Sequence, residues 1–104
     1  MSLVFSGVIL TVLTGLGAEP EVSEDCTWNG IPLHGDVQVV DSFPDIKVEV
    51  VESFPDLNVQ VVQNFPDDCG EWEFVDSFPD FTIQYVDSFP DIKIKMVQSF
   101  PGVE

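Results

Sequence analysis

A four-residue phrase repeats along most of the chain and limits the folds that it can adopt. The phrase Ser42-Phe43-Pro44-Asp45 recurs with small changes, so that phenylalanines stand at positions 43, 54, 65, 78, 89 and 100. The spacing is 11 residues, except for one interval of 13 between Phe65 and Phe78. Repetition at a fixed period is typical of chains that copy one small structural unit in tandem.

The segments between the phrases carry the alternation of a β-strand. In residues 46–51, Ile46, Val48 and Val50 fall on one face, whereas Lys47 and Glu49 fall on the other. Residues 57–62, 81–86 and 92–97 repeat this pattern, each ending on valine. That last valine breaks the alternation, and a bend would turn it inward as well. No segment has the period of an amphipathic helix, so we predict an all-β chain.

The repeated phrase itself predicts a turn. Proline fixes its own φ angle and pushes the preceding phenylalanine towards an extended conformation. Proline followed by aspartate suits a type I turn, in which the carboxylate bonds nearby backbone N–H groups. We expect the large apolar phenylalanine to plug one end of the core. The predicted turn and core residues are Phe43, Pro44, Phe54, Pro55, Phe65, Pro66, Phe78, Pro79, Phe89, Pro90, Phe100 and Pro101.

Units this short can be assembled in three ways. They can form an up-and-down meander, a very thin β-helix or a small closed ring. Because every turn has the same chemistry, we favour a compact closed or wound structure of short strands.

The first residues are apolar and predict export. Residues 3–18 form a continuous apolar run, which is shorter than the roughly 20 residues of a membrane-spanning helix but suits a signal peptide. We therefore predict a signal peptide or hydrophobic leader at 1–18, an acidic tether at 19–25 and one domain at 26–104. The product is secreted or periplasmic, and it is membrane-anchored if the leader is not cleaved. The missing basic residue before the run keeps open an uncleaved anchor or a buried strand or helix.

Two cysteines, Cys26 and Cys69, predict a disulfide, because an even pair in an exported protein is usually oxidised. Closing so long a loop contributes about 4 kcal/mol in the chain-entropy model. The alternative is two buried thiols. A zinc site would need two more ligands, and His34 is the only histidine.

The formal net charge of −16, with three lysines and no other base than His34, excludes several partners. Such a surface repels nucleic acids and anionic lipids, whereas it attracts cations or a basic protein. We expect membrane contact only through an uncleaved leader, and we expect a monomer.

The repeated carboxylates are the main candidates for chemistry. Asp45, Asp56, Asp80 and Asp91 would attract calcium if they stacked at the spacing of neighbouring strands. An aspartate required at every turn is more simply a turn residue, since catalysis needs two unlike carboxylates in one place. We predict no catalytic residue and no cofactor, and a structural role for His34.

Residues 28–103 resemble the small bacterial septoil-knot domain family. The resemblance is carried by Gly30-Ile-Pro-Leu-His-Gly35, by the six phrases and by the longer interval with Gly70-Glu-Trp-Glu-Phe74. It implies an all-β domain with a deep 7(1) torus knot. It implies no known catalytic activity and no site residues.

These observations predict a non-enzymatic, exported structural or recognition module. The alternative is an acidic, calcium-dependent binding or adhesion module, and a glycan-active enzyme is a distant third. We expect any function to lie where the repeat fails, at 26–35 and 68–72.

Overall fold

The structure, a computed structural model, describes residues 22–103. This part consists of β-strands and turns, and it holds no helix of the length and hydropathy that a membrane span requires. The predicted leader and the first three residues of the predicted tether lie outside the described residues. The strands are β1 (Thr27–Trp28), β2 (Ile31–Pro32), β3 (Gly35–Val39), β4 (Ile46–Val50), β5 (Leu57–Val61), β6 (Glu71–Phe74), β7 (Phe81–Tyr85) and β8 (Ile92–Met96).

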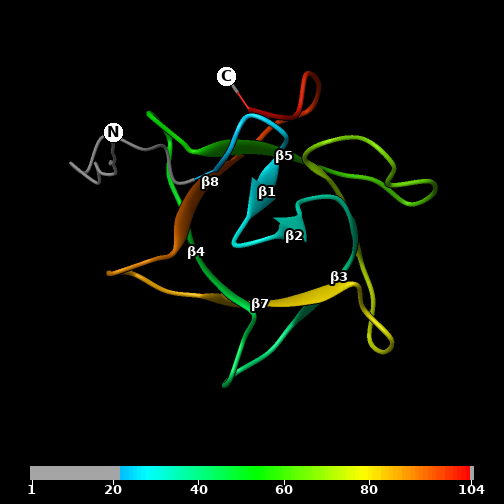
Figure 1. Ribbon diagram of the computed structural model, residues 1–104, viewed down its shortest axis with the longest axis horizontal. Helices are drawn as coiled ribbons and strands as arrows, with labels where there is room; N and C mark the ends of the chain where they lie inside the picture. The colour runs from blue at the N-terminus through cyan, green and yellow to red at the C-terminus, as the bar shows by residue number, and fades with distance from the viewer. Residues whose placement is uncertain (1–21, 104) are drawn as a thin grey trace, which may run out of the picture.

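Strands β3 to β8 form a closed barrel in the order β3-β6-β5-β8-β4-β7, and Figure 1 looks into this ring. Every pair in the ring is parallel. The predicted all-β closed structure is therefore confirmed, and the up-and-down meander is excluded because its neighbours would be antiparallel.

The chain winds twice around the ring. Strands β3, β4 and β5 take alternate places, and β6, β7 and β8 fill the places between them. Four connections therefore skip one strand, whereas β5 passes directly to its neighbour β6. The connection from β5 to β6, residues 62–70, is longer than the others and holds the two extra residues of the 13-residue repeat. The longer repeat therefore marks the place where the chain changes from the first winding to the second.

The register explains how such short connections join parallel strands. At each of the six interfaces, the last residue of one strand faces the residue two before the end of the next, as Val39 faces Ile83 and Tyr85 faces Val48. In the next pair Ile83 faces Ile46, so the end of β3 is level with the start of β4. The connection at 40–45 only has to step over β7, about 10 Å for two strand spacings. Parallel crossovers usually need a dozen residues or more.

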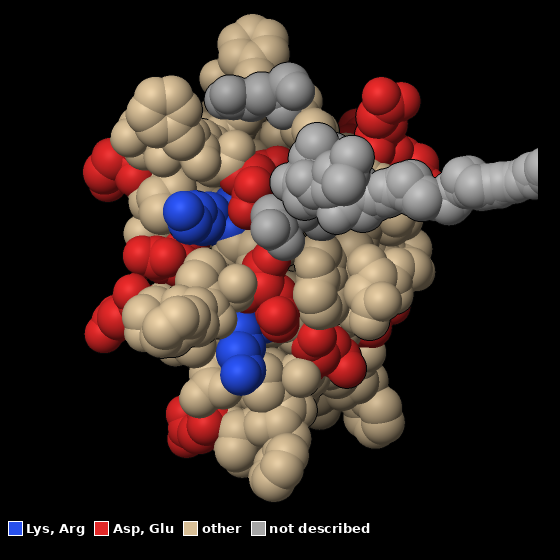
Figure 2. Space-filling model, turned by 60° about the vertical axis from the view of Figure 1, so that its left-hand side comes forward, with Lys and Arg blue, Asp and Glu red and all other residues tan. Residues whose placement is uncertain are grey.

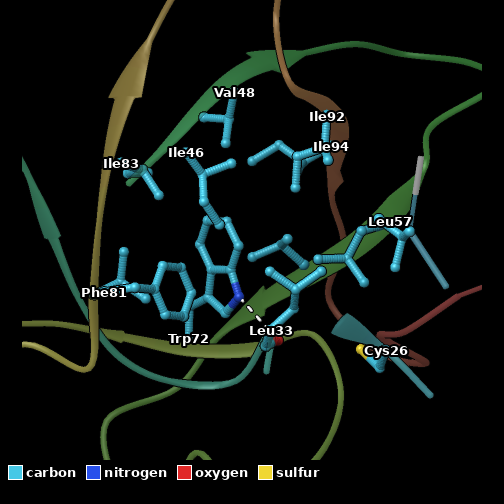
Figure 3. Packing of buried hydrophobic residues seen from close by; sticks show 13 residues of the cluster. Cys26, Leu33, Ile46, Val48, Leu57, Trp72, Phe81, Ile83, Ile92 and Ile94 are labelled. Carbon is cyan, nitrogen blue, oxygen red and sulfur yellow. Dashed lines mark hydrogen bonds between the residues drawn. The ribbon is translucent and has the colours of Figure 1, made fainter. Parts of the chain in front are cut away.

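The core fills the barrel with two layers of inward side chains. Inward-facing residues of the strands supply these layers, and the side chains of both layers are at most 2% exposed. Trp72 lies at the centre, edge-on to Phe81 with ring centroids 5.6 Å apart (Figure 3). Burying each such side chain contributes about 1.5–3 kcal/mol. The layers are Ile46, Leu57, Phe81 and Ile92, then Val37, Val48, Val59, Trp72, Ile83 and Ile94.

The predicted inward face is too long by one residue. Val50 was expected beside Ile46 and Val48, but it is 47% exposed, as its equivalents in the other strands are at 37–48%. Two layers of side chains fill the interior of the barrel, and the last residue of each strand extends past them at its carboxyl end. The valine that follows is only half-buried, although its N–H continues the ladder: Val51 N–H donates to the Ile94 carbonyl at 2.8 Å.

The even positions face outward and carry charges and amides. Lys47 and Lys93 are exposed and Glu49 is half-buried. In Figure 2, acidic side chains are scattered over the visible face between protruding uncharged ones, with two basic groups among them.

The non-repeating segment before β3 covers one end of the barrel. Strands β1 and β2 form an antiparallel hairpin that lies over the centre of the ring in Figure 1. Its turn is Asn29-Gly30, with φ values of 52° and 84°, and this residue pair is typical of a tight hairpin turn. Leu33 is fully buried, and its carbonyl accepts a hydrogen bond from Trp72 Nε1 at 3.2 Å. The hairpin is therefore part of the core.

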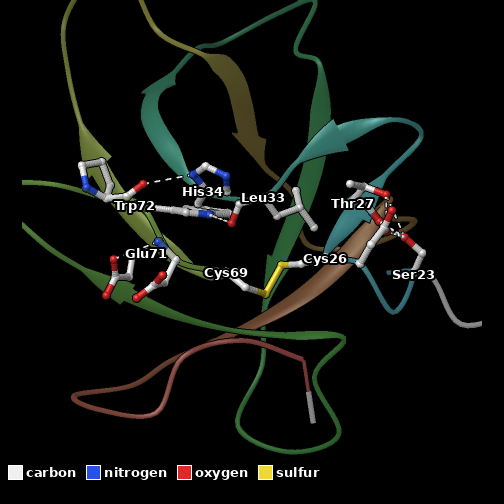
Figure 4. The surroundings of a disulfide bond; sticks show 11 residues. Ser23, Cys26, Thr27, Leu33, His34, Cys69, Glu71 and Trp72 are labelled. Atoms are coloured by element: carbon white, nitrogen blue, oxygen red, sulfur yellow. Dashed lines mark hydrogen bonds between the residues drawn. A yellow bond between two sulfur atoms is a disulfide. The ribbon is translucent and has the colours of Figure 1, made fainter.

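The disulfide predicted between Cys26 and Cys69 is present, with Cα atoms 5.9 Å apart. Figure 4 shows that it links the hairpin segment to the loop before β6. Gly70 N–H donates to the Leu33 carbonyl at 3.0 Å beside it. The bridge fixes the covering segment to the barrel.

Candidate functional site

The six phenylalanines of the repeated turns do not plug the core. They are 82–97% exposed, whereas Phe81, which starts a strand, is 2% exposed. Figure 1 shows why: the connections project outward from the ring in different directions. Because four of the connections step over the outside of a strand, their tips point away from the interior. The prediction that Phe43, Phe54, Phe65, Phe78, Phe89 and Phe100 pack into the core is therefore wrong.

The backbone of these turns also differs from the prediction. All six phenylalanines have positive φ angles, from 54° to 59°, where an extended conformation was expected before proline. A left-handed conformation is rare for a bulky residue and is unfavourable by about 1–2 kcal/mol. The chain therefore already bends at the phenylalanine, before the proline and aspartate. They place a strained, exposed aromatic residue at each tip.

Four of the aspartates that follow the turn prolines bond their turn to a distant strand, and we call each such pairing a latch. Asp91 N–H donates to the Lys47 carbonyl at 2.8 Å, and Asp91 Oδ2 accepts from Lys47 N–H at 2.8 Å. The same two-way pairing joins Asp56 to Lys93 and Asp80 to Asp36. Asp45 pairs with the backbone N–H and hydroxyl of Thr82. The predicted backbone bonding is confirmed, but the partners are 37 or 44 residues away, in the strand that the turn crosses.

These four aspartates do not assemble a calcium site in the structure. Each carboxylate is bonded to a different strand. Among residues 22–103, no group of three or more histidine, cysteine, aspartate or glutamate side chains is placed to hold a metal ion. The aspartates therefore form separate latches around the ring, and they do not stack in the way that would attract calcium.

A cavity of about 290 Å³ lies between the hairpin and the start of β7. It is lined by Ile31, Pro32, His34, Asp80 and Phe81. His34 Nδ1 donates a hydrogen bond to the Pro66 carbonyl at 3.1 Å, and Asp80 Oδ2 accepts one from Asp36 N–H at 2.8 Å. The cavity offers one carboxylate, not the two unlike carboxylates that glycoside hydrolysis uses. His34 holds the hairpin against the 62–70 connection.

The exposure of the turn phenylalanines was not predicted, although the length of the connections contains a signal for it. The four connections that cross a strand have six residues each, of which proline is rigid and aspartate must reach the crossed strand. So short a segment cannot also return its phenylalanine to the interior.

The fold defines a class: small all-β domains in which parallel strands of one chain interleave to close a barrel. Residues 30–104 match the model of the 7(1) septoil knot domain, and the chain belongs to this family. It is also similar to the uncharacterised protein slr1025 of Synechocystis sp., with 62% identity over 64 residues. That match covers 61% of this chain and 57% of the relative, so the chain spans little more than half of that protein.

Proposed function

We propose that the chain is a non-enzymatic, exported recognition module that binds through its six exposed phenylalanines. The single observation that carries this proposal is the exposure of all six, at 82–97%, on backbones in the left-handed conformation. Strained backbone that persists in every copy of a repeat points to a functional requirement, because folding alone would favour a relaxed turn. Exposed apolar groups in such number are typical of interaction sites.

Rigidity supports the same role. Four of the six phenylalanines are followed within two residues by an aspartate that is bonded to another strand, so these tips are held at fixed places. Tips that are ordered before binding lose little conformational entropy when a partner covers them. Six similar tips also allow several weak contacts to act together.

Export is supported by two features. The Cys26–Cys69 disulfide suits an oxidising compartment, and residues 3–18 have the composition of a signal-peptide core. Cell fractionation of the full chain tests this point: we expect the disulfide-bonded form outside the cytoplasm, and recovery only in the cytoplasm would contradict it.

Binding is tested with the tip variant, in which all six turn phenylalanines are replaced by asparagine. Asparagine tolerates the left-handed conformation but removes the aromatic ring. Fluorescently labelled wild-type chain is expected to bind the surface of the cells that produce it, and the tip variant to lose at least about tenfold in apparent affinity. Equal binding by a folded tip variant would contradict the proposal.

A further inference from the structure

Within residues 22–103, the end of the barrel opposite the hairpin carries a ring of partly exposed apolar residues. Because all six strands are parallel, their last residues gather at one end. By alternation, these residues point to the same side as the core residues. We call this ring the collar; it consists of Val39, Val50, Val61, Phe74, Tyr85 and Met96, which are 37–48% exposed.

The collar continues the core without a gap. Each collar residue faces a fully buried residue of the next strand, as Val50 faces Ile94 and Met96 faces Val59. Phe74 also contacts Trp72 edge-on, with ring centroids 6.3 Å apart. The collar is therefore supported by the packed core, and it can be covered by a partner without rearrangement of the barrel.

An acidic rim surrounds the collar. Two residues after each collar residue, the chain leaves the barrel at an exposed position that is acidic in four of the six turns. Gln84 Nε2 donates to the carbonyl of Asp41 at 2.9 Å, and Gln38 Nε2 donates to that of Asp76 at 3.0 Å. These amides hold the rim against the outside of the crossed strands. The rim consists of Asp41, Glu52, Gln63, Asp76, Asp87 and Gln98.

We propose that the collar and its acidic rim bind a cationic amphipathic segment of a partner protein. This inference rests on the proposed recognition function. It adds the collar as a second binding surface beside the turn tips and names the chemistry of the partner. An apolar centre inside a negative rim matches a segment with an apolar face flanked by lysine or arginine. A second copy would place rim against rim, and the net charge of −16 disfavours that pairing. Anionic lipid is disfavoured for the same reason.

Tyr85 gives a direct readout of binding. It is the only tyrosine of the chain, so its ring signals in NMR are assigned without ambiguity. Burial raises the pKa of the Tyr85 hydroxyl above its ordinary value. A segment that covers the collar removes more water from this hydroxyl and should raise its pKa further.

The test uses the full chain and a synthetic 18-residue amphipathic helix of leucine and lysine as the probe. We expect saturable binding by calorimetry, with shifts of the Tyr85 ring signals. The double substitution Val50→Lys with Tyr85→Lys should weaken binding at least about tenfold. The matched control, Ser53→Lys with Ser88→Lys, adds the same charge at two exposed positions of the turns that follow Val50 and Tyr85, and it should change binding less than about twofold. Circular dichroism checks that both variants are folded.

Three results would overturn the inference. Equal loss in both lysine variants would mean that the probe senses only overall charge. Equal binding of a helix with glutamate in place of lysine would remove the role of the rim. A dimer of the wild-type chain that the collar variant abolishes would assign the collar to a second copy. The proposed recognition function fails separately, if the tip variant still binds cells.

Discussion

Two groups of aromatic residues in this chain have opposite environments, although both belong to the same repeat. Phe81 and Trp72 lie in strands, are at most 2% exposed and pack edge-on against each other. Phe78, only three residues before Phe81, is 94% exposed at a turn tip. The comparison shows that apolar surface has two uses here: in the strands it stabilises the barrel, and at the tips it is available to a partner.

The largest expected effect contrasts these two groups directly. Phe81→Ala removes a buried ring and should lower the free energy of unfolding by about 3–5 kcal/mol. Phe78→Ala is the matched control and should change it by less than about 0.5 kcal/mol, because the ring makes no core contact. Urea denaturation followed by Trp72 fluorescence measures both. Similar losses in the two variants would contradict the contrast.

The covered end should be stabilised by its disulfide. Replacing Cys26 and Cys69 by serine releases a loop with a sequence separation of 43 residues, which should lower the free energy of unfolding by about 4 kcal/mol. The wild-type chain in reductant should unfold at the same urea concentration as this variant. A loss below about 1 kcal/mol would show that packing of Leu33 alone holds the hairpin.

The latches should contribute less. Asp91→Ala leaves Lys47 N–H without its carboxylate partner, and we expect a loss of about 2 kcal/mol in the free energy of unfolding. Asp87→Ala changes an exposed acid in the same turn and serves as the control, with an expected change below about 0.5 kcal/mol. If both variants lose the same amount, general charge would explain the effect.

The smallest expected effect concerns Asp25, near the start of the described chain. The hydroxyl of Ser23, and then that of Thr27, hold the pKa of Asp25 below its ordinary value. A lowered folded-state pKa contributes stability that is present above the unfolded-state pKa and is lost as pH falls through the folded-state pKa. Asp25→Ala should therefore be slightly less stable than wild type at pH 7 and equal to it near pH 2. A difference that grows on acidification would contradict this assignment.

Local chemistry predicted the parts of this fold that depend on neighbouring residues. Alternation at period two identified the strands and the inward positions of Ile46 and Val48. The cysteine pair predicted the disulfide. These features follow from short-range rules that hold in any fold.

The features that were missed depend on the register of the closed barrel. Val50 obeys the alternation, but it extends beyond the second core layer. Phe43, Phe54, Phe78 and Phe89 face solvent because each of their turns crosses outside a strand that comes from the other winding. Asp91 bonds a strand 44 residues away. The deep 7(1) knot implied by the family stays a prediction, and the interleaved double winding supports it.

The central claim is that the turn phenylalanines are displayed for binding and do not hold the fold together. The most direct test is the free energy of unfolding of the tip variant. Since asparagine relieves left-handed strain at six positions and no core contact is lost, the tip variant should be at least as stable as the wild type. A loss of several kcal/mol would show that these rings support the structure and would contradict the account.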